Sequence, residues 1–153
     1  MYRIMKMVAK GLASLVVAWV IVLAVWARVG SAPPLGIVNG SLLPCPPTPN
    51  CVATQDAEQL MPALPMQGGA AATVDRLVRL IEAQPRAGVV ERRADYVRAE
   101  FRSRLFGYVD DVEFHVVESS GEVRFRSASR IGRGDLGVNR ARMELLSAAY
   151  LRP

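Results

Sequence analysis

The hydrophobic pattern begins with one long apolar run. Residues 11–27 contain no charged side chain, and extending the run back to Val8 gives twenty residues. A helix of that length measures about 30 Å, which is enough to cross the hydrocarbon core of a bilayer. Lys10 lies close enough to the start of the run to reach the head groups. The pattern predicts that residues 1–28 form a transmembrane signal-anchor helix, in contact with the lipid bilayer through residues 8–27.

Beyond this run, residues 29–72 show no apolar periodicity. Six prolines lie between residues 31 and 50, and this composition predicts an extended, semi-rigid spacer. Within it, Cys45 and Cys51 enclose five residues. A pair this close predicts a structural disulfide in an oxidising compartment. A redox-active pair is less favoured, because such a pair normally encloses only two residues.

Helical and then alternating patterns follow over residues 73–153. Apolar residues recur at helical spacing from Val74 to Ile81 and predict a helix over residues 73–84 that Pro85 ends. Alternation then predicts strands near residues 89–93, 96–105, 111–116 and 123–130, and a last helix runs from Asn139 to about residue 151. This order predicts an α+β fold, an antiparallel meander sheet of three to four strands with helices packed on one face.

The predicted sheet has one apolar face and one charged face. Residues directly opposite each other must share a face, and a two-residue turn at Ser120 and Gly121 then places Asp111 opposite Arg130. Glu113 is expected diagonal to both Arg126 and Arg130. One interpretation of this second face is a solvated surface of cross-strand ion pairs. The other is a docking surface for a partner protein or an anionic group.

The most unusual stretch is residues 124–144, R-F-R-S-A-S-R-I-G-R-G-D-L-G-V-N-R-A-R-M-E, which holds six arginines. Glycine amides, a helix start and nearby arginines could together bind a phosphate or carboxylate. Alternatively, Asp135 caps the backbone amides or pairs with an arginine, and so locks the turn from strand to helix. The candidate residues for anion binding or partner docking are Arg124, Arg126, Arg130, Arg133, Asp135, Asn139, Arg140, Asp111 and Glu113.

This stretch resembles R-S-A-S-R-I-G-x-x-D-L-G-V-N-R-x-R-x-E, the signature of the family called domain of unknown function 1499. Residues 43–52, L-P-C-P-P-T-P-N-C-V, resemble the L-x-P-C-P-x-x-P-N-C-V opening of the same family. The resemblance extends over residues 43–151 and includes A-E-F-R-S and V-D-D-V-E-F between these motifs. It implies a secreted or membrane-attached protein of bacteria or plastid-bearing organisms, and it brings no established activity, ligand or catalytic residue.

The charge is concentrated at the amino terminus. The chain carries a net charge of +5, of which Arg3, Lys6, Lys10 and Arg28 supply four. The rest is nearly neutral, which argues against a nucleic-acid partner, since that would need a basic face. Three of the four basic residues precede the apolar run, so the amino terminus is expected in the cytoplasm and the domain outside, in the periplasm or its equivalent. A cleaved signal peptide is the alternative, because residues 25–27, V-W-A, loosely resemble a cleavage site.

These patterns favour a non-catalytic protein. The sequence contains no nucleophile–base arrangement, phosphate-loop motif or metal-ligand cluster, so neither a catalytic residue nor a metal or other cofactor is predicted. The leading hypothesis is an outward-facing, membrane-anchored binding or accessory protein that supports the assembly or stability of a membrane or envelope complex. The alternative is an enzyme or small-molecule binder acting on an anionic ligand between Arg130 and Arg140. A concave site with unpaired groups would favour a ligand, and a flat, mutually paired face would favour a protein partner.

Overall fold

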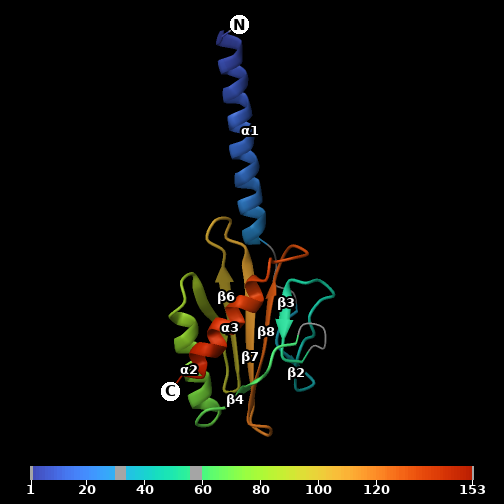
Figure 1. Cartoon of the computed structure of the whole chain (residues 1–153), viewed down its shortest axis with the longest axis vertical. Helices are drawn as coiled ribbons and strands as arrows, with labels where there is room; N and C mark the ends of the chain where they lie inside the picture. Colours follow the sequence, from blue (N-terminus) through green and yellow to red (C-terminus); the bar gives the residue numbers. More distant parts are fainter. Residues whose placement is uncertain (1, 30–33, 56–59, 153) are drawn as a thin grey trace.

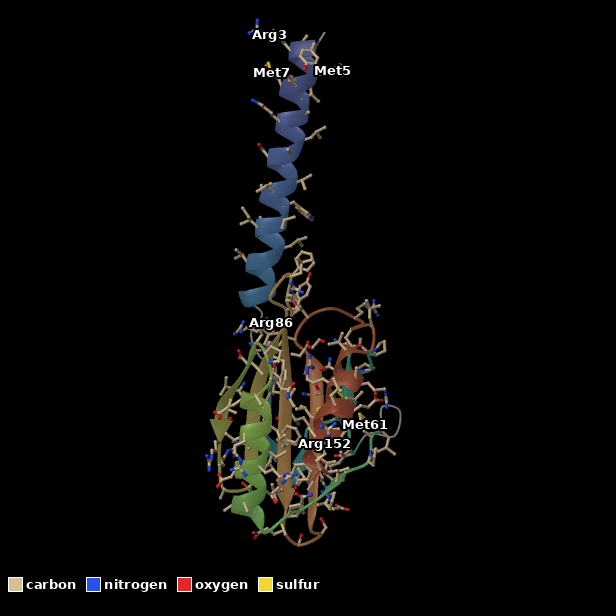
Figure 2. The ribbon with its side chains drawn as sticks, turned by 60° about the vertical axis from the view of Figure 1, so that its left-hand side comes forward. Arg3, Met5, Met7, Met61, Arg86 and Arg152 are labelled. Atoms are coloured by element: carbon tan, nitrogen blue, oxygen red, sulfur yellow. A yellow bond between two sulfur atoms is a disulfide. The ribbon has the colours of Figure 1, made fainter. Side chains whose placement is uncertain are left out.

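The computed structural model describes residues 2–29, 34–55 and 60–152. A long amino-terminal helix, α1 (Tyr2–Val29), extends away from a domain of strands and helices (Figure 1). Within α1, Tyr2–Leu23 is apolar and long enough to cross a membrane. Its side chains project outward, as Arg3, Met5 and Met7 do at the end far from the domain (Figure 2). The predicted apolar helix is therefore present.

The domain is built on a six-stranded antiparallel sheet. Its strands are β3 (Cys51–Ala53), β4 (Leu64–Pro65), β5 (Ala87–Arg92), β6 (Tyr96–Arg102), β7 (Val109–Val117) and β8 (Glu122–Ser129). They are ordered β3-β8-β7-β6-β5, with β4 also paired to β8. The α+β prediction is confirmed, but the expected three to four strands were too few. The extra strands, β3 and β4, come from the proline-rich segment and are too short to show an alternating pattern.

Two helices cover the apolar face of this sheet. They are α2 (Ala70–Glu82) and α3 (Val138–Tyr150), which lie side by side over the strands (Figure 1). Helix α2 begins three residues before the expected Thr73, whose buried hydroxyl instead bonds to the backbone of Gln67. The core joins apolar residues of both helices to the inward side chains of the sheet, including Phe114 and Phe125.

The register of β7 and β8 differs from the expected one by two residues. Phe114 lies opposite Phe125, and Asp111 lies opposite Ala128 rather than Arg130. The turn contains four residues, 118–121, instead of two, and its glycine amide donates to the carbonyl of Glu118. A change of two residues keeps every side chain on its face, so the division into apolar and charged faces is unaffected.

The second, charged face of the sheet is covered. Residues 34–50, which were expected to form a spacer, fold across it through a small hairpin of β1 (Ile37–Val38) and β2 (Ser41–Leu42). We call residues 34–50 the covering segment. The chain then enters the sheet as β3 beside β8. The spacer expectation failed because proline disfavours helices and long strands but does not prevent a segment from packing on a neighbouring surface. The interpretation of a solvated face is wrong for its central residues, which are buried.

A disulfide between Cys45 and Cys51 closes this covering segment, with the two Cα atoms 5.7 Å apart. Cys51 is the first residue of β3 and is buried. The predicted pairing is therefore present, and it ties the proline-rich loop to the sheet.

Replacing both cysteines, Cys45→Ser with Cys51→Ser, should lower the free energy of unfolding by about 2 kcal/mol, because the unfolded chain loses the constraint of a small closed loop. Urea unfolding of the full chain in detergent, followed by near-UV circular dichroism, would measure this. A reductant should produce the same loss in the wild type and no change in the double variant. Equal stability of wild type and variant would contradict the assignment.

Candidate functional site

Strands β6, β7 and β8 place a charged cluster beneath the covering segment. Alternate positions on neighbouring strands put Asp111 and Glu113 of β7 beside Arg126 of β8 on one face. The exposed fractions of these three residues are 1%, 0% and 5%. Buried charges are strongly unfavourable unless they are paired and hydrogen-bonded, so their partners decide the local structure.

Glu113 is the most enclosed member of the cluster. Its Oε1 accepts the backbone N–H of Gly36 at 2.7 Å and the hydroxyl of Tyr96 at 2.8 Å, and its Oε2 accepts Arg126 Nη1 at 3.2 Å. Burial, together with the neighbouring Glu113 charge, raises the pKa of Tyr96, so its hydroxyl remains a donor. The carboxylate therefore joins the covering segment, β6 and β8 at one point.

Asp111 has a separate partner, Arg130. The Nε and Nη2 atoms of Arg130 donate to the two Asp111 oxygens at 2.7 and 2.8 Å, a bidentate pair. Arg130 also binds Glu100. Hydrogen bonds to Asp111 raise the pKa of Arg130 despite its burial. Burial alone would raise the pKa of Glu100, but the bond and charge of Arg130 lower it. The predicted Asp111–Arg130 pair thus forms, although by a diagonal contact.

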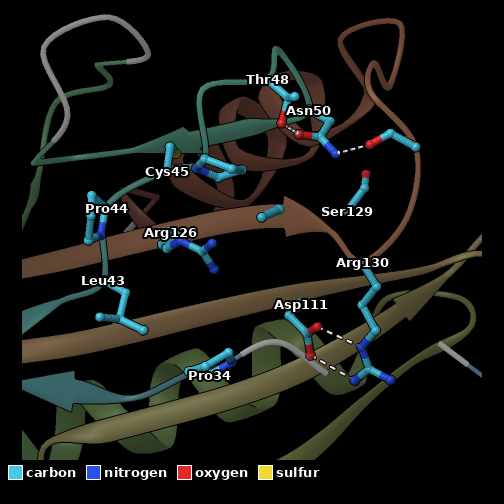
Figure 3. A pocket seen from close by; sticks show the side chains of 13 residues that line it. Pro34, Leu43, Pro44, Cys45, Thr48, Asn50, Asp111, Arg126, Ser129 and Arg130 are labelled. Carbon is cyan, nitrogen blue, oxygen red and sulfur yellow. Dashed lines mark hydrogen bonds and ion pairs between the residues drawn. The ribbon is translucent and has the colours of Figure 1, made fainter. Parts of the chain in front are cut away.

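A cavity of about 520 Å³ lies between the covering segment and this cluster (Figure 3). Leu43, Pro44 and Pro46 line it from the covering segment. Arg126, Asp111 and Arg130 line it from the sheet and the segment that follows. We call this cavity the Arg126 pocket. Its volume lies within the range of small-molecule sites.

Arg126 is incompletely paired inside this pocket. Its Nη1 binds Glu113, whereas its buried Nε has no hydrogen-bond partner in the part of the chain that the structure describes. Arg130 uses the corresponding Nε, with Nη2, to hold a carboxylate. A buried donor without a partner costs about 1–3 kcal/mol, so the Arg126 guanidinium is the group in the pocket with most to gain from an added acceptor.

A second polar cluster fixes the start of α3. Asp135 accepts the N–H of Gly137 at 3.0 Å and that of Asn139 at 2.8 Å. Burial alone would raise the pKa of Asp135, but these hydrogen bonds lower it. The helix begins at Val138 after Gly137, whose φ is 80°, so Asn139 is not the N-cap that the sequence suggested. Asp135 therefore supplies the side-chain oxygens that accept from the free backbone amides at the helix start.

Asn139 is instead a buried connector. Its side chain accepts from Ser127 at 2.6 Å and donates to the carbonyl of Asn50 at 3.1 Å, which links α3, β8 and the covering segment. Arg142 also donates to Asn139 and forms an ion pair with Asp110. Sequence reasoning omitted Arg142, although its position three residues after Asn139 places both on one side of a helix.

The structure therefore separates the predicted site residues into groups. Asp111, Glu113, Arg126 and Arg130 lie together under the covering segment. Asp135 and Asn139 belong to the start of α3. There Asp135 accepts hydrogen bonds from the backbone amides that the sequence suggested as an anion site. Arg124 lies near Glu122, outside the pocket, while Arg133 and Arg140 are exposed.

Among the described residues, no group of three or more histidine, cysteine or acidic side chains is arranged to hold a metal ion.

Part of the chain matches a known protein family. The family model described as a protein of unknown function (DUF1499) matches residues 41–149, which include the second part of the covering segment, the charged residues of both polar clusters and most of α3. Comparisons with curated proteins and with solved structures found no match.

Asp135→Asn should lower the free energy of unfolding by about 1 kcal/mol at neutral pH, because the helix start loses a charged cap. A carboxyl whose folded pKa is depressed contributes stability above its ordinary value of 3.8 and loses it as the pH falls through the folded pKa. The difference between wild type and variant should therefore shrink below about pH 4. Urea unfolding at pH 7 and pH 3 would test this, with Glu144→Gln on α3 as an exposed carboxylate control. A difference that does not change with pH would contradict it.

Proposed function

Since the chain belongs to this family of proteins of unknown function, we propose that it is a single-pass membrane-anchored binding protein that holds a small anionic molecule in the Arg126 pocket. Helix α1 would anchor it, and the domain would lie on the outer side of an inner (plasma) membrane. The observation that carries the proposal is the Arg126 guanidinium, which is 5% exposed, lines a cavity of ligand size and has a buried donor without a partner among the described residues.

The pocket walls favour a particular kind of ligand. Leu43, Pro44 and Pro46 provide apolar contact on one side, whereas Arg126 provides hydrogen-bond donors and positive charge on the other. Asp111 is already held by the Nε and Nη2 atoms of Arg130. These features fit a carboxylate or phosphate carried on a small apolar body.

Binding is better supported than docking of a protein on the charged face. The covering segment occupies the centre of that face, and Glu113 is held there by donors from three segments. The charged groups of the pocket are held in ion pairs, which supports a preorganised binding site rather than one that transfers protons. The site lies beside the proposed 130–140 stretch and shares Arg130 with it.

Binding of benzoate and phenyl phosphate to the full chain in nanodiscs would test the ligand class. Both probes should shift the side-chain Nε–H signal of Arg126 in ¹⁵N-resolved NMR spectra, and neutral benzamide should bind at least tenfold more weakly. Arg126→Met should weaken binding of both anions by at least tenfold, because the charged donors are lost.

Arg124→Met is the matched control, since Arg124 lies two residues away on the same strand and the same face but outside the pocket. Arg126→Lys guards against misfolding, because it keeps a charge near Glu113 and should retain part of the affinity. Equal binding of benzamide and benzoate would contradict an anion site. Equal affinity in the Arg126→Met and Arg124→Met variants would contradict the location.

The proposed orientation predicts which cysteine an impermeant maleimide can reach in intact cells. Ser120→Cys, in the exposed β7–β8 turn, should be labelled from outside, whereas Tyr2→Cys should be labelled only after the membrane is permeabilised. Cys45 and Cys51 form a disulfide and should not react. Labelling of Tyr2→Cys but not of Ser120→Cys in intact cells would show the opposite orientation. The mass of the intact protein would show whether the anchor is retained.

A further inference from the structure

Two loops at one end of the sheet expose apolar side chains. Residues 103–108 connect β6 to β7, and residues 130–137 connect β8 to α3. We call them the tip loops. Leu105 of the first loop is 79% exposed, and Leu136 of the second is 104% exposed, the largest value among the exposed apolar side chains of the described chain. Neither leucine contributes to the core of the domain.

Leu136 also has an unusual backbone. Its φ is 54°, in the left-handed region that residues with a Cβ atom rarely adopt. The Asp135 bonds to Gly137 and Asn139 hold the loop around it. The fold therefore maintains a leucine in a strained conformation that projects it fully away from the domain, and packing within the domain gives no reason for it.

Each tip loop also carries an exposed arginine. Arg104 precedes Leu105, and Arg133 lies three residues before Leu136. Neither arginine has a hydrogen bond or ion pair with any residue that the structure describes. An exposed apolar side chain beside an unpaired arginine suits the surface of a bilayer, where apolar groups enter the acyl boundary and arginine binds lipid phosphate.

The tip loops are neighbours. A cavity of about 300 Å³ lies between them, lined by Ser103 and Tyr108 from the first and by Ile131 and Gly134 from the second. The backbone N–H of Arg130 also donates to the carbonyl of Val109 at 3.1 Å, where the two loops begin to separate. They therefore form one continuous surface.

This surface faces the anchor. Pro34 lines the Arg126 pocket together with Arg130 and Gly132, so the chain enters the domain at the end that bears the tip loops. Five residue steps separate Pro34 from Val29 at the end of α1, and they can extend at most about 18 Å. Figure 1 places the end of α1 beside these loops. The opposite end of the sheet carries the polar turn at residues 118–121.

We propose that the tip loops are a second membrane contact, in which Leu105 and Leu136 enter the bilayer surface and Arg104 and Arg133 bind the phosphates of anionic lipids. This proposal rests on the anchoring of α1 in the proposed function. The contact would hold the domain against the membrane in one orientation, with the Arg126 pocket near the lipid surface.

Site-specific fluorescence in nanodiscs would test the contact. The full chain would carry an environment-sensitive nitrobenzoxadiazole label at Leu105→Cys or Leu136→Cys, in discs of phosphatidylcholine and phosphatidylglycerol that contain doxyl-labelled lipid. Both labels should be quenched at least threefold more than a label at Leu145→Cys, a matched leucine on α3 that is 71% exposed. Quenching at the tip loops no greater than at Leu145→Cys would overturn the proposal.

A label at Val16→Cys in α1 separates failure of the tip loops from failure of the anchor. If Val16→Cys is quenched and the tip loops are not, the anchor stands and the second contact is wrong. If Val16→Cys is not quenched, the proposed anchoring itself fails. The label emission at the tip loops could also shift to the blue by the same amount in detergent as in nanodiscs, and the shift could weaken on dilution of the protein. That result would show that a second copy of the chain covers the tip loops, and it would overturn the lipid assignment.

The arginines have their own test. Replacing both arginines, Arg104→Glu with Arg133→Glu, should lower quenching of the Leu136→Cys label at least twofold in discs that contain phosphatidylglycerol. A Leu136→Cys chain that keeps both arginines should show the same twofold reduction when the discs contain phosphatidylcholine alone. Arg79→Glu with Arg152→Glu matches the charge change elsewhere and should have no effect. If inorganic phosphate lowers the quenching and lipid charge does not change it, the arginines bind a soluble anion instead of lipid. If the Arg104→Glu and Arg133→Glu substitutions leave the quenching unchanged, the arginines have no role in the contact.

Discussion

The structure of the domain depends on a carboxylate that water does not reach. Glu113 is fully buried in the middle of the sheet, and an isolated charge there would be unfavourable by several kcal/mol. Its three donors come from the covering segment, β6 and β8. Folding of the proline-rich segment over the sheet therefore does more than hide surface. It supplies one of the hydrogen bonds that make a charge at this position acceptable.

This arrangement leads to the proposed site. The covering segment is fixed by Gly36 at one end and by the Cys45–Cys51 disulfide and β3 at the other, and the Arg126 pocket lies beneath it. Asp111 binds Arg130 through both oxygens and also forms an ion pair with Arg98, whereas Arg126 pairs with Glu113 alone among the described residues. The same network that stabilises the buried charges leaves one arginine with a donor to offer a ligand. Stability and proposed binding thus share a cause.

The sequence predicted the apolar face well, because alternation over seven to nine residues in β6, β7 and β8 is a strong signal. It also predicted the disulfide, both helices of the domain and the Asp111–Arg130 pair. Three features could not be predicted from the sequence. Turns of two and four residues preserve the same alternation, so the register was ambiguous. Strands as short as β4 carry no period. Finally, arginines and carboxylates usually face water, and nothing local reveals that another segment will cover them.

Hydrogen exchange at the backbone amide of Gly36 is the most direct test of this account. In the full chain, that amide donates to a buried carboxylate, and its exchange should be slowed to nearly the level set by global unfolding, as for amides at the centre of β7. NMR of the ¹⁵N-labelled chain in nanodiscs would measure both. Exchange of Gly36 at the rate of an unstructured peptide, with β7 still protected, would show that the segment is a free spacer and that no covered pocket exists.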